Sequence, residues 1–247
     1  MVLEVRGVVK RFGAERALGP IDLVFSSGTT ALIGPSGCGK STLLRLLVGL
    51  IEPDAGEVLC DGALITPATI AAVRRRIGYV IQDGGLFPHL SATDNVSLLA
   101  TQSGWSQGRI ATRLAELAQL VHLSDDALAR HPRELSGGQR QRVSLMRALM
   151  LDPDVILLDE PLGALDPIIR AELQVDLKNI FARLAKTVVL VTHDLGEAGF
   201  LASRIALLKD GRVLQLGSLE AFYETPADPF VARFVRAQTY ALPWKPQ

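Results

Sequence analysis

The amino-acid sequence predicts an α/β fold with a mixed-sheet core, a small antiparallel β-subdomain and an inserted α-helical subdomain. Three observations predict it: short apolar runs near the N-terminus, two β-rich runs that flank a long helical segment, and a region of helical periodicity between these parts. With 247 residues, the chain can bury a substantial core, as one large domain or as a core with a subdomain.

The N-terminal part predicts short strands. Apolar runs cover Val2–Val9, Ile21–Phe25 and Thr29–Ile33, and turn residues separate them. The stretch Glu52–Gly62 has the pattern of a turn, a short strand and a second turn. Such a series of short strands predicts a small antiparallel sheet.

The later part of the chain predicts a parallel strand–helix–strand unit. Two β-rich runs, Val155–Asp159 and Thr187–Asp194, flank the helical segment Pro167–Ala185. This order and spacing are typical of strands that lie in a sheet with the helix packed against one face.

Between residues 87 and 151 the sequence has helical periodicity and little strand signal. Ser136 can cap the last helix of this region. Its apolar stripe is expected at Val143, Met146 and Met150, broadened by Leu145 and Leu149. We expect one domain, with 1–86 and 152–247 forming the core and 87–151 forming the helical subdomain.

Composition narrows the function. Lys plus Arg number 26 and Asp plus Glu number 26, so no overall field favours nucleic acid or an anionic membrane, and we expect no nucleic-acid partner. Two cysteines, Cys38 and Cys60, are too few for a disulfide framework. Charged residues interrupt the N-terminus, so we expect no signal peptide, and no stretch approaches the roughly 18 apolar residues of a membrane span. We expect a soluble chain whose membrane role, if any, needs other subunits.

The segment Gly34–Ser41 fits the phosphate-binding pattern GxxxxGK[ST], between a predicted strand and a predicted helix, Ser41–Leu50. Glycines let consecutive N–H groups point at phosphate oxygens, and the helix N-terminus adds partial positive charge. Lys40 can reach the β- and γ-phosphates, and the Ser41 hydroxyl can bind Mg²⁺. The loop itself comprises Gly34, Pro35, Ser36, Gly37, Cys38, Gly39, Lys40 and Ser41.

Cys38 has two interpretations. It is either a small residue that fills space in the loop, or a reactive thiol whose pKa the nearby helix N-terminus lowers.

Two carboxylates, Asp159 and Glu160, end the buried-strand run Val155–Asp159. In a phosphate-loop enzyme such a strand lies beside the loop, so Asp159 can hold the magnesium shell and Glu160 can act as general base. The alternative is an ordinary acidic turn before Pro161.

A second helix start predicts an anion-binding end. Leu135–Gln139 reads LSGGQ, with Ser136 as N-cap and glycines behind it. Two phosphate-binding helix ends in one chain make sense if the second serves a nucleotide held by another subunit. The alternative is a capped helix with a flexible entrance.

With these motifs the sequence resembles the ATP-binding cassette (ABC) ATPases over nearly its whole length. Seven elements match the family in order: Phe12 (adenine stacking), Gly34 to Thr42 (Walker A), Gln82 (metal and nucleotide contact), Ser136, Gly137, Gly138 and Gln139 within Leu135–Gln139 (signature), Asp159 with Glu160 (Walker B), Gly163–Asp166 (dimer interface) and His193 (γ-phosphate sensing). Taken singly, Phe12 could be core, Gln82 an uninformative polar residue, and His193 a structural histidine at a strand end.

The resemblance implies a P-loop NTPase of ABC-ATPase fold with a RecA-like mixed-sheet core. It implies ATP and Mg²⁺ as cofactors, the metal held by Ser41, Gln82 and Asp159. Two subunits would bind head to tail, so that Ser136 of one closes on the γ-phosphate that the other holds on Lys40.

Three classes of ABC protein compete: a transporter ATPase, a soluble ATPase of DNA repair or chromosome structure, and a translation-type protein. The single cassette without sustained heptads or cysteine clusters favours the transporter. Partners would be a second ATPase subunit, membrane permease subunits docking near Gln82, and indirectly a periplasmic or extracellular solute-binding protein. The chain would lie at the cytoplasmic face of the inner membrane.

Among transporters, RRRIGYVIQ, GLFPHL and GALDPI look most like importers of quaternary-amine osmoprotectants such as glycine betaine, choline or proline. Importers of sulfonate, nitrate or amino acids, and exporters, are the alternatives. The sequence departs from the osmoprotectant pattern at RVSLMRAL and at Asp83-Gly84, and its end at Gln247 predicts no appended regulatory domain.

Overall fold

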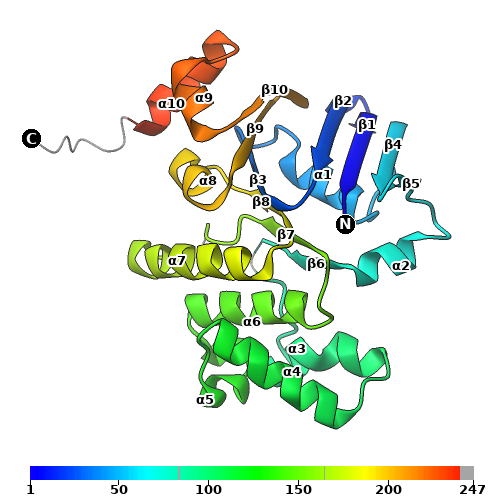
Figure 1. Ribbon diagram of the computed structural model, residues 1–247, viewed down its shortest axis with the longest axis vertical. Helices are drawn as coiled ribbons and strands as arrows, with labels where there is room; N and C mark the ends of the chain where they lie inside the picture. The colour runs from blue at the N-terminus through cyan, green and yellow to red at the C-terminus, as the bar shows by residue number, and fades with distance from the viewer. Residues whose placement is uncertain (83, 164, 240–247) are drawn as a thin grey trace, which may run out of the picture. The chain divides into compact units, whose positions relative to one another are not determined.

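The computed structural model describes residues 1–82, 84–163 and 165–239 (Figure 1). Asp83 and Ala164, which belong to two of the motifs above, lie outside the described residues. The chain forms two compact units: unit 1 comprises Met1 with Thr66–Val188, and unit 2 comprises Val2–Ile65 with the chain from Val189 onward. The boundaries of these units differ from the boundaries of the predicted helical subdomain, 87–151. That subdomain therefore stays a prediction.

Unit 2 contains the predicted antiparallel sheet, but the apolar run Thr29–Ile33 is not part of it, because that run forms a strand of a second sheet. The strands of the antiparallel sheet are β1 (Leu3–Phe12), β2 (Glu15–Phe25), β4 (Ala55–Cys60) and β5 (Ala63–Leu64), in the order β2-β1-β4-β5. Both β1 and β2 are longer than predicted: β1 continues past its apolar run Val2–Val9 to Phe12, and β2 begins at Glu15, before its apolar run Ile21–Phe25. The β1–β2 ladder contains several register shifts, and each shift interrupts the two-residue alternation on which the prediction depends.

Unit 2 also contains strands of a second sheet, ordered β10-β9-β3-β8. β3 (Gly28–Ile33) pairs in parallel with β9 (Arg204–Lys209), which pairs antiparallel with β10 (Arg212–Gly217). The helices of this unit are α1 (Lys40–Leu47), α8 (Leu195–Leu201), α9 (Leu219–Glu224) and α10 (Pro229–Thr239). α1 is shorter than predicted because Val48 is its C-cap and Gly49 adopts a φ of 62°.

One apolar cluster holds the C-terminal helices of unit 2 on its strands. Its buried members come from β3, β9, α8, α9 and α10: Ala31, Ile33, Leu195, Ala198, Ile205, Leu207, Phe222, Val231 and Val235. Burying this many apolar side chains stabilises α8 and α10 against β9 and against β3, the strand that precedes the phosphate loop.

In unit 1, β6 (Ile77–Val80) pairs in parallel with β7 (Val155–Asp159), and the chain passes from unit 1 to unit 2 within β8 (Thr187–Val191). α7 (Pro167–Leu184) connects β7 to β8, as the strand–helix–strand pattern predicts. α2 (Ile70–Arg75) precedes β6. Every residue of β7 is buried, so Asp159, its last residue, and Glu160, which follows, lie at the end of a core strand.

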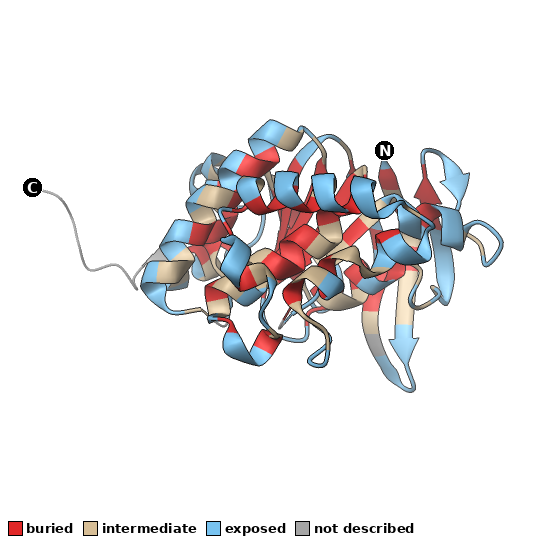
Figure 2. Ribbon diagram, turned by 90° about the horizontal axis from the view of Figure 1, so that it is seen from below, coloured by how far each residue is buried: buried red, intermediate tan, exposed pale blue. Residues whose placement is uncertain are grey.

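The helical part of unit 1 is also as predicted (green in Figure 1). It contains α3 (Ala92–Gln102), α4 (Gln107–Leu120), α5 (Asp125–Leu128), a 3₁₀ turn (Pro132–Glu134) and α6 (Gly137–Leu149). Serines cap α3, α4 and α6. The expected stripe of α6 is buried, and α4 has buried residues on one face and exposed residues on the other. Figure 2 shows buried and exposed residues side by side along helical ribbons.

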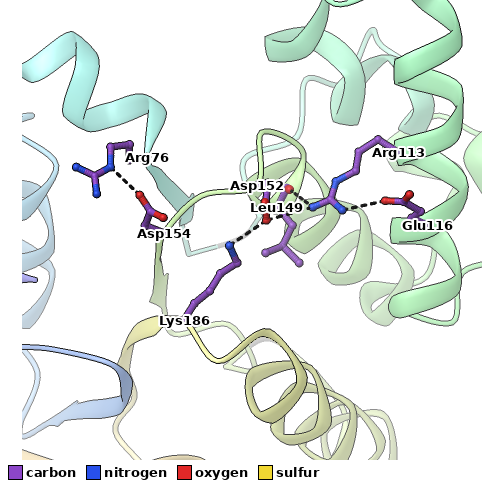
Figure 3. Close-up of polar contacts among 7 residues, drawn as sticks. All are labelled: Arg76, Arg113, Glu116, Leu149, Asp152, Asp154 and Lys186. Atoms are coloured by element: carbon purple, nitrogen blue, oxygen red, sulfur yellow. Dashed lines mark hydrogen bonds and ion pairs between the residues drawn. The ribbon is translucent and has the colours of Figure 1, made fainter. Parts of the chain in front are cut away.

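A polar network holds the turn that leads into β7 (Figure 3). Asp152 accepts a hydrogen bond of 2.9 Å from Lys186 and lies 3.7 Å from the guanidinium of Arg113, which also donates to the Leu149 carbonyl at 3.1 Å. Arg76 donates to Asp154 at 2.6 Å. These contacts connect α4, the end of α6 and the residue before β8 within unit 1.

None of the helices in the described part of the chain combines the length and the apolar character that a membrane span requires.

Candidate nucleotide-binding site

The phosphate loop of unit 2 needs glycine at two positions for packing reasons. Gly34 (φ 143°) and Gly39 (φ 105°) adopt left-handed backbone conformations. A Cβ at Gly34 would lie 2.1 Å from the Leu208 carbonyl oxygen, and one at Gly39 would lie 2.3 Å from Leu18. The protein itself therefore excludes side chains there. Gly37 (φ 77°) has nothing within 4 Å of its Cβ position, so the loop is open at this point.

Lys40 is the first residue of α1 and is only 6% exposed. Its ammonium donates to the carbonyls of Gly34 (2.8 Å) and Pro35 (3.1 Å) and lies 3.8 Å from the Cys38 sulfur. The lysine thus curls back over the loop, and its contacts among the described residues are to uncharged groups. A buried cation held by neutral acceptors, beside a helix N-terminus and an open loop, fits an incoming anion.

The structure decides between the two interpretations of Cys38. The thiol is buried, at 5% exposed. Burial raises its pKa, and the nearby Lys40 offsets this effect only in part. The hypothesis of a lowered pKa is therefore wrong, because desolvation of the thiolate outweighs the helix N-terminus and the lysine charge. Cys38 is a space-filling residue of the loop.

Phe12 and His193 also belong to unit 2. Phe12 ends β1, is 51% exposed and has the Lys10 ammonium 5.7 Å from its ring centroid, so it is not a core residue. An exposed ring at a strand end can stack on a base.

His193 is exposed and follows β8. Its backbone is held by Gln238 of α10, whose amide donates to the His193 carbonyl (3.1 Å) and accepts from the Leu195 N–H (3.5 Å). Sequence reasoning missed Gln238, because a single glutamine in a C-terminal helix carries no local signal.

In unit 1, the Walker B pair ends β7 as predicted. Asp159 is 5% exposed. Glu160 turns the chain with a φ of 47°, and its carbonyl accepts from the Gly163 N–H at 3.2 Å. A positive φ at a non-glycine residue is uncommon and is typical of functional turns, where it directs a side chain away from the strand.

The signature helix α6 begins with a capping box. Ser136 Oγ accepts from the Gln139 N–H at 3.2 Å, and Gln139 Oε1 accepts from the Ser136 N–H at 2.9 Å. The glycines have a packing role that the sequence did not reveal. A Cβ at Gly137 would lie 3.1 Å from Leu165, and one at Gly138 would lie 2.7 Å from the Cγ2 of Ile169. A side chain at Gly138 would therefore force α6 or Ile169 of α7 to shift, whereas one at Gly137 would need only a small movement of Leu165, which precedes α7.

The end of the predicted interface segment lies beside the start of α6, where the signature glycines are. Asp166 is the N-cap of α7, and its carboxylate accepts from the N–H groups of Ile168 and Ile169, both at 3.1 Å. Ile169 in turn packs on Gly138. Within unit 1, the tips of α6 and α7 therefore lie together.

Gln82 is exposed and follows β6. The backbone just after it is held by a residue that sequence reasoning did not select: Arg147 of α6 donates to the carbonyls of Gly84 and Gly85, each at 2.7 Å.

The family model for ABC transporters matches residues 19–163 of this chain. The chain belongs to the ABC transporter family. Curated relatives include the glycine betaine/carnitine/choline transport ATP-binding protein OpuCA of Bacillus subtilis, 44% identical over 90% of this chain and 59% of that protein. Another is the sulfate/thiosulfate import ATP-binding protein CysA of Caulobacter vibrioides, 45% identical over 95% of this chain and 70% of that protein.

Among solved structures, the dimeric post-hydrolysis state of the cassette MJ0796 bound to ADP and Pi superposes with a TM-score of 0.79. It is 34% identical and covers 88% of this ABC chain and 98% of that chain. These comparisons confirm the expected family and the ABC ATPase fold. The ABC chain spans about three fifths of the length of OpuCA, 59%.

Proposed function

We propose that this ABC protein hydrolyses ATP as one copy of a head-to-tail dimer and so powers import of a solute through membrane permease subunits. The observation that carries the proposal is the buried Lys40 ammonium beside an open glycine loop. Among the described residues, this ammonium contacts only two carbonyls and a thiol. Such a charge favours phosphate oxygens over water because it is already desolvated.

ATP fits this loop for a second reason. α1 begins at Lys40 behind Gly39, which supplies no side-chain cap, and the N-terminus of a helix carries partial positive charge that favours an anion. Ser36, Gly37 and Thr42 complete the proposed phosphate contacts, and Phe12 offers its exposed ring to the adenine.

The donor set also fits Mg²⁺. No group of three or more His, Cys, Asp or Glu side chains among the described residues could hold a metal alone. Magnesium usually takes one or two carboxylates together with substrate phosphates, which matches Asp159 with Ser41 and Gln82. When bound, the ion neutralises charge that develops on the transferring phosphoryl group.

The remaining catalytic and interface roles are assigned to individual residues. We assign Glu160 as the base that accepts a proton from the attacking water, and His193 as the residue that contacts the γ-phosphate. Lys40 stabilises the phosphate charge. Ser136, Gly137, Gly138 and Gln139 are assigned to the nucleotide of the second copy, with Asp166 at the dimer interface.

The dimer proposal is supported by the similarity to MJ0796, whose structure is described as dimeric and bound to ADP and Pi. The permease and solute-binding protein are inferred from the transport functions that the names of OpuCA and CysA state. We place the chain at the cytoplasmic face of the inner membrane, where permease subunits would dock near Gln82.

For cargo we propose a quaternary-amine osmoprotectant. OpuCA supports this choice, whereas CysA is similarly close and would favour sulfate. An ATPase subunit does not touch cargo, so its sequence carries little information on it. ATPase activity in vesicles with the cognate permease, compared between glycine betaine and sulfate, separates the two.

The test of hydrolysis is Glu160→Gln. Loss of the base should reduce phosphate release by about 10²–10⁴-fold. ATP with magnesium should then trap a dimer, seen as a doubled mass in light scattering. The matched control is Glu172→Gln, which removes the same charge from an exposed position of α7 and should leave turnover unchanged.

Lys40→Ala should weaken ATP binding, by about tenfold or more, through loss of a charge-assisted contact. A Glu160→Gln protein that hydrolyses ATP normally, or stays monomeric with saturating ATP and magnesium, contradicts the proposal.

A further inference from the structure

The backbone after Gln82 is clamped by a side chain from the signature helix. One guanidinium, that of Arg147, donates from Nη1 to the Gly85 carbonyl and from Nη2 to the Gly84 carbonyl, both at 2.7 Å. Both glycines have positive φ, 72° and 57°. Because a guanidinium presents its donors in a rigid fork, the two bonds define the position of both peptide groups.

Close packing supports the same contact. A Cβ at Gly84 would lie 2.5 Å from the Oγ of Ser144, and one at Gly85 would lie 2.3 Å from the Cδ1 of Ile81. Ser144 is fully buried, and its hydroxyl donates to the Arg140 carbonyl of the same helix at 2.9 Å. Gly84 therefore lies directly on α6.

The other end of α6 holds the signature tip. Arg140 donates to the Leu135 carbonyl at 2.7 Å, and the capping box orders Ser136. α6 has 13 residues without an internal break. A helix of that kind moves as one body, so displacement of one end is transmitted to the other.

We propose that Arg147 is a positioning residue that couples the Gln82 segment to the Ser136 tip through α6. The inference rests on the proposed function, in which Gln82 binds magnesium and Ser136 serves the nucleotide of the second copy. Among the described residues, Arg147 bonds to the carbonyls of Gly84 and Gly85 rather than to Gln82 or Ser136. It sets where the backbone at these two glycines lies, so that their movement and movement of the tip become one event.

The environment of the guanidinium explains why arginine suits this position. Arg147 is half-buried, and burial lowers its pKa below the ordinary arginine value. Arginine stays charged in such surroundings, and it keeps two donors on two carbonyls where an ammonium is a single compact charge. It also lines a cavity of about 160 Å³ together with residues of α2, β6 and α3, so it lies at the edge of an accessible surface.

The test compares Arg147→Met, which keeps length but removes the donors, with Arg147→Lys. The readouts are ATPase rate against magnesium concentration, affinity for a fluorescent ATP analogue in EDTA, and melting temperature. Arg147→Met should raise the half-saturating magnesium concentration by about tenfold while leaving metal-free nucleotide affinity within about twofold. Arg147→Lys should fall between this variant and the wild type.

Arg142→Met is the matched control, because Arg142 lies on the same helix but contacts the Val121 carbonyl and forms an ion pair of 2.7 Å with Asp176. It should lower the melting temperature without changing the magnesium dependence.

The proposal is overturned if Arg147→Met keeps the wild-type magnesium dependence, or if Arg142→Met changes it equally. Should Arg147→Met fail to fold, a folded Arg147→Lys with wild-type magnesium dependence overturns it as well. Failure of the proposed function is seen separately, as a Glu160→Gln protein that still turns over.

Discussion

Substituting alanine for Gly138 tests the contact between the signature helix and α7. Gly138 is the second residue of α6, and an added Cβ would lie 2.7 Å from the Cγ2 of Ile169. Carbon atoms normally approach to roughly 3.5–4.0 Å, so the two helices would have to separate by about 1 Å. Ile169 cannot turn this methyl aside easily, because its side chain branches at Cβ and is stiff at χ1.

Two effects of opposite sign decide how much Gly138→Ala changes the free energy of unfolding. Overpacking a closely packed contact destabilises the fold by about 1–3 kcal/mol. Replacing glycine by alanine in a helix stabilises it by about 0.5–1 kcal/mol. We expect the free energy of unfolding to fall by about 1–2 kcal/mol, which for a chain of this size lowers the melting temperature by about 2–8 °C.

Gly108 provides a control at the corresponding position of another helix. It is the second residue of α4, behind the N-cap Ser106, just as Gly138 lies behind Ser136. A Cβ at Gly108 would have nothing within 4 Å. Gly108→Ala should therefore stabilise the protein by about 0.5–1 kcal/mol, because the helix-propensity gain is unopposed.

The assay is differential scanning calorimetry combined with denaturant unfolding of both variants. Adding Ile169→Ala to Gly138→Ala should recover at least about 1 kcal/mol relative to the sum of the single changes, as expected for residues in contact. If Gly138→Ala is as stable as Gly108→Ala, or if the double variant is additive, the packing explanation for the signature glycine is refuted.

Two further predictions concern groups with shifted pKa values. Because burial raises the pKa of the Cys38 thiol, a Cys60→Ser protein should react with a thiol reagent more slowly than free cysteine near neutral pH, and faster as pH rises; a rate at or above that of free cysteine contradicts this. The hydrogen bond from Lys186 lowers the pKa of Asp152, so their pair stabilises the fold above the ordinary carboxyl pKa and is lost as pH falls through the lower folded value. Asp152→Asn should accordingly cost up to about 1 kcal/mol near neutral pH and little in strong acid; a difference from wild type that does not change with pH contradicts this (Figure 3).

Many elements before residue 195 could be predicted from the sequence because their signals are local, whereas α8, β9, β10, α9 and α10 were not predicted. The βαβ pattern around Pro167–Leu184 and the capped helix behind Ser136 depend on residues that are neighbours in the chain. The ends of β1 and β2 could not be placed, since register shifts disturb the alternation that marks a strand.

Some properties of the site also have local sequence signals, whereas others depend on how the chain packs. The motifs around Lys40, Ser136 and Glu160 combine residue types at short spacings, and those spacings alone indicate phosphate and metal chemistry. The pKa of Cys38 could not be inferred, because it depends on how deeply the loop is buried, and burial outweighs the charge beside it.

By itself, the sequence determined the family, the order of the motifs, the Ser136 cap of the signature helix and the cores of the strands around the motifs. Only the tertiary structure decided that Gly138 packs on Ile169, that Gln238 holds the His193 backbone and that Arg147 clamps the two glycines after Gln82. The physical reason is the range of the interactions. Dihedral preferences, caps and periodicity act within a few residues, whereas a clamp between residues about sixty positions apart exists only after the core has closed around both.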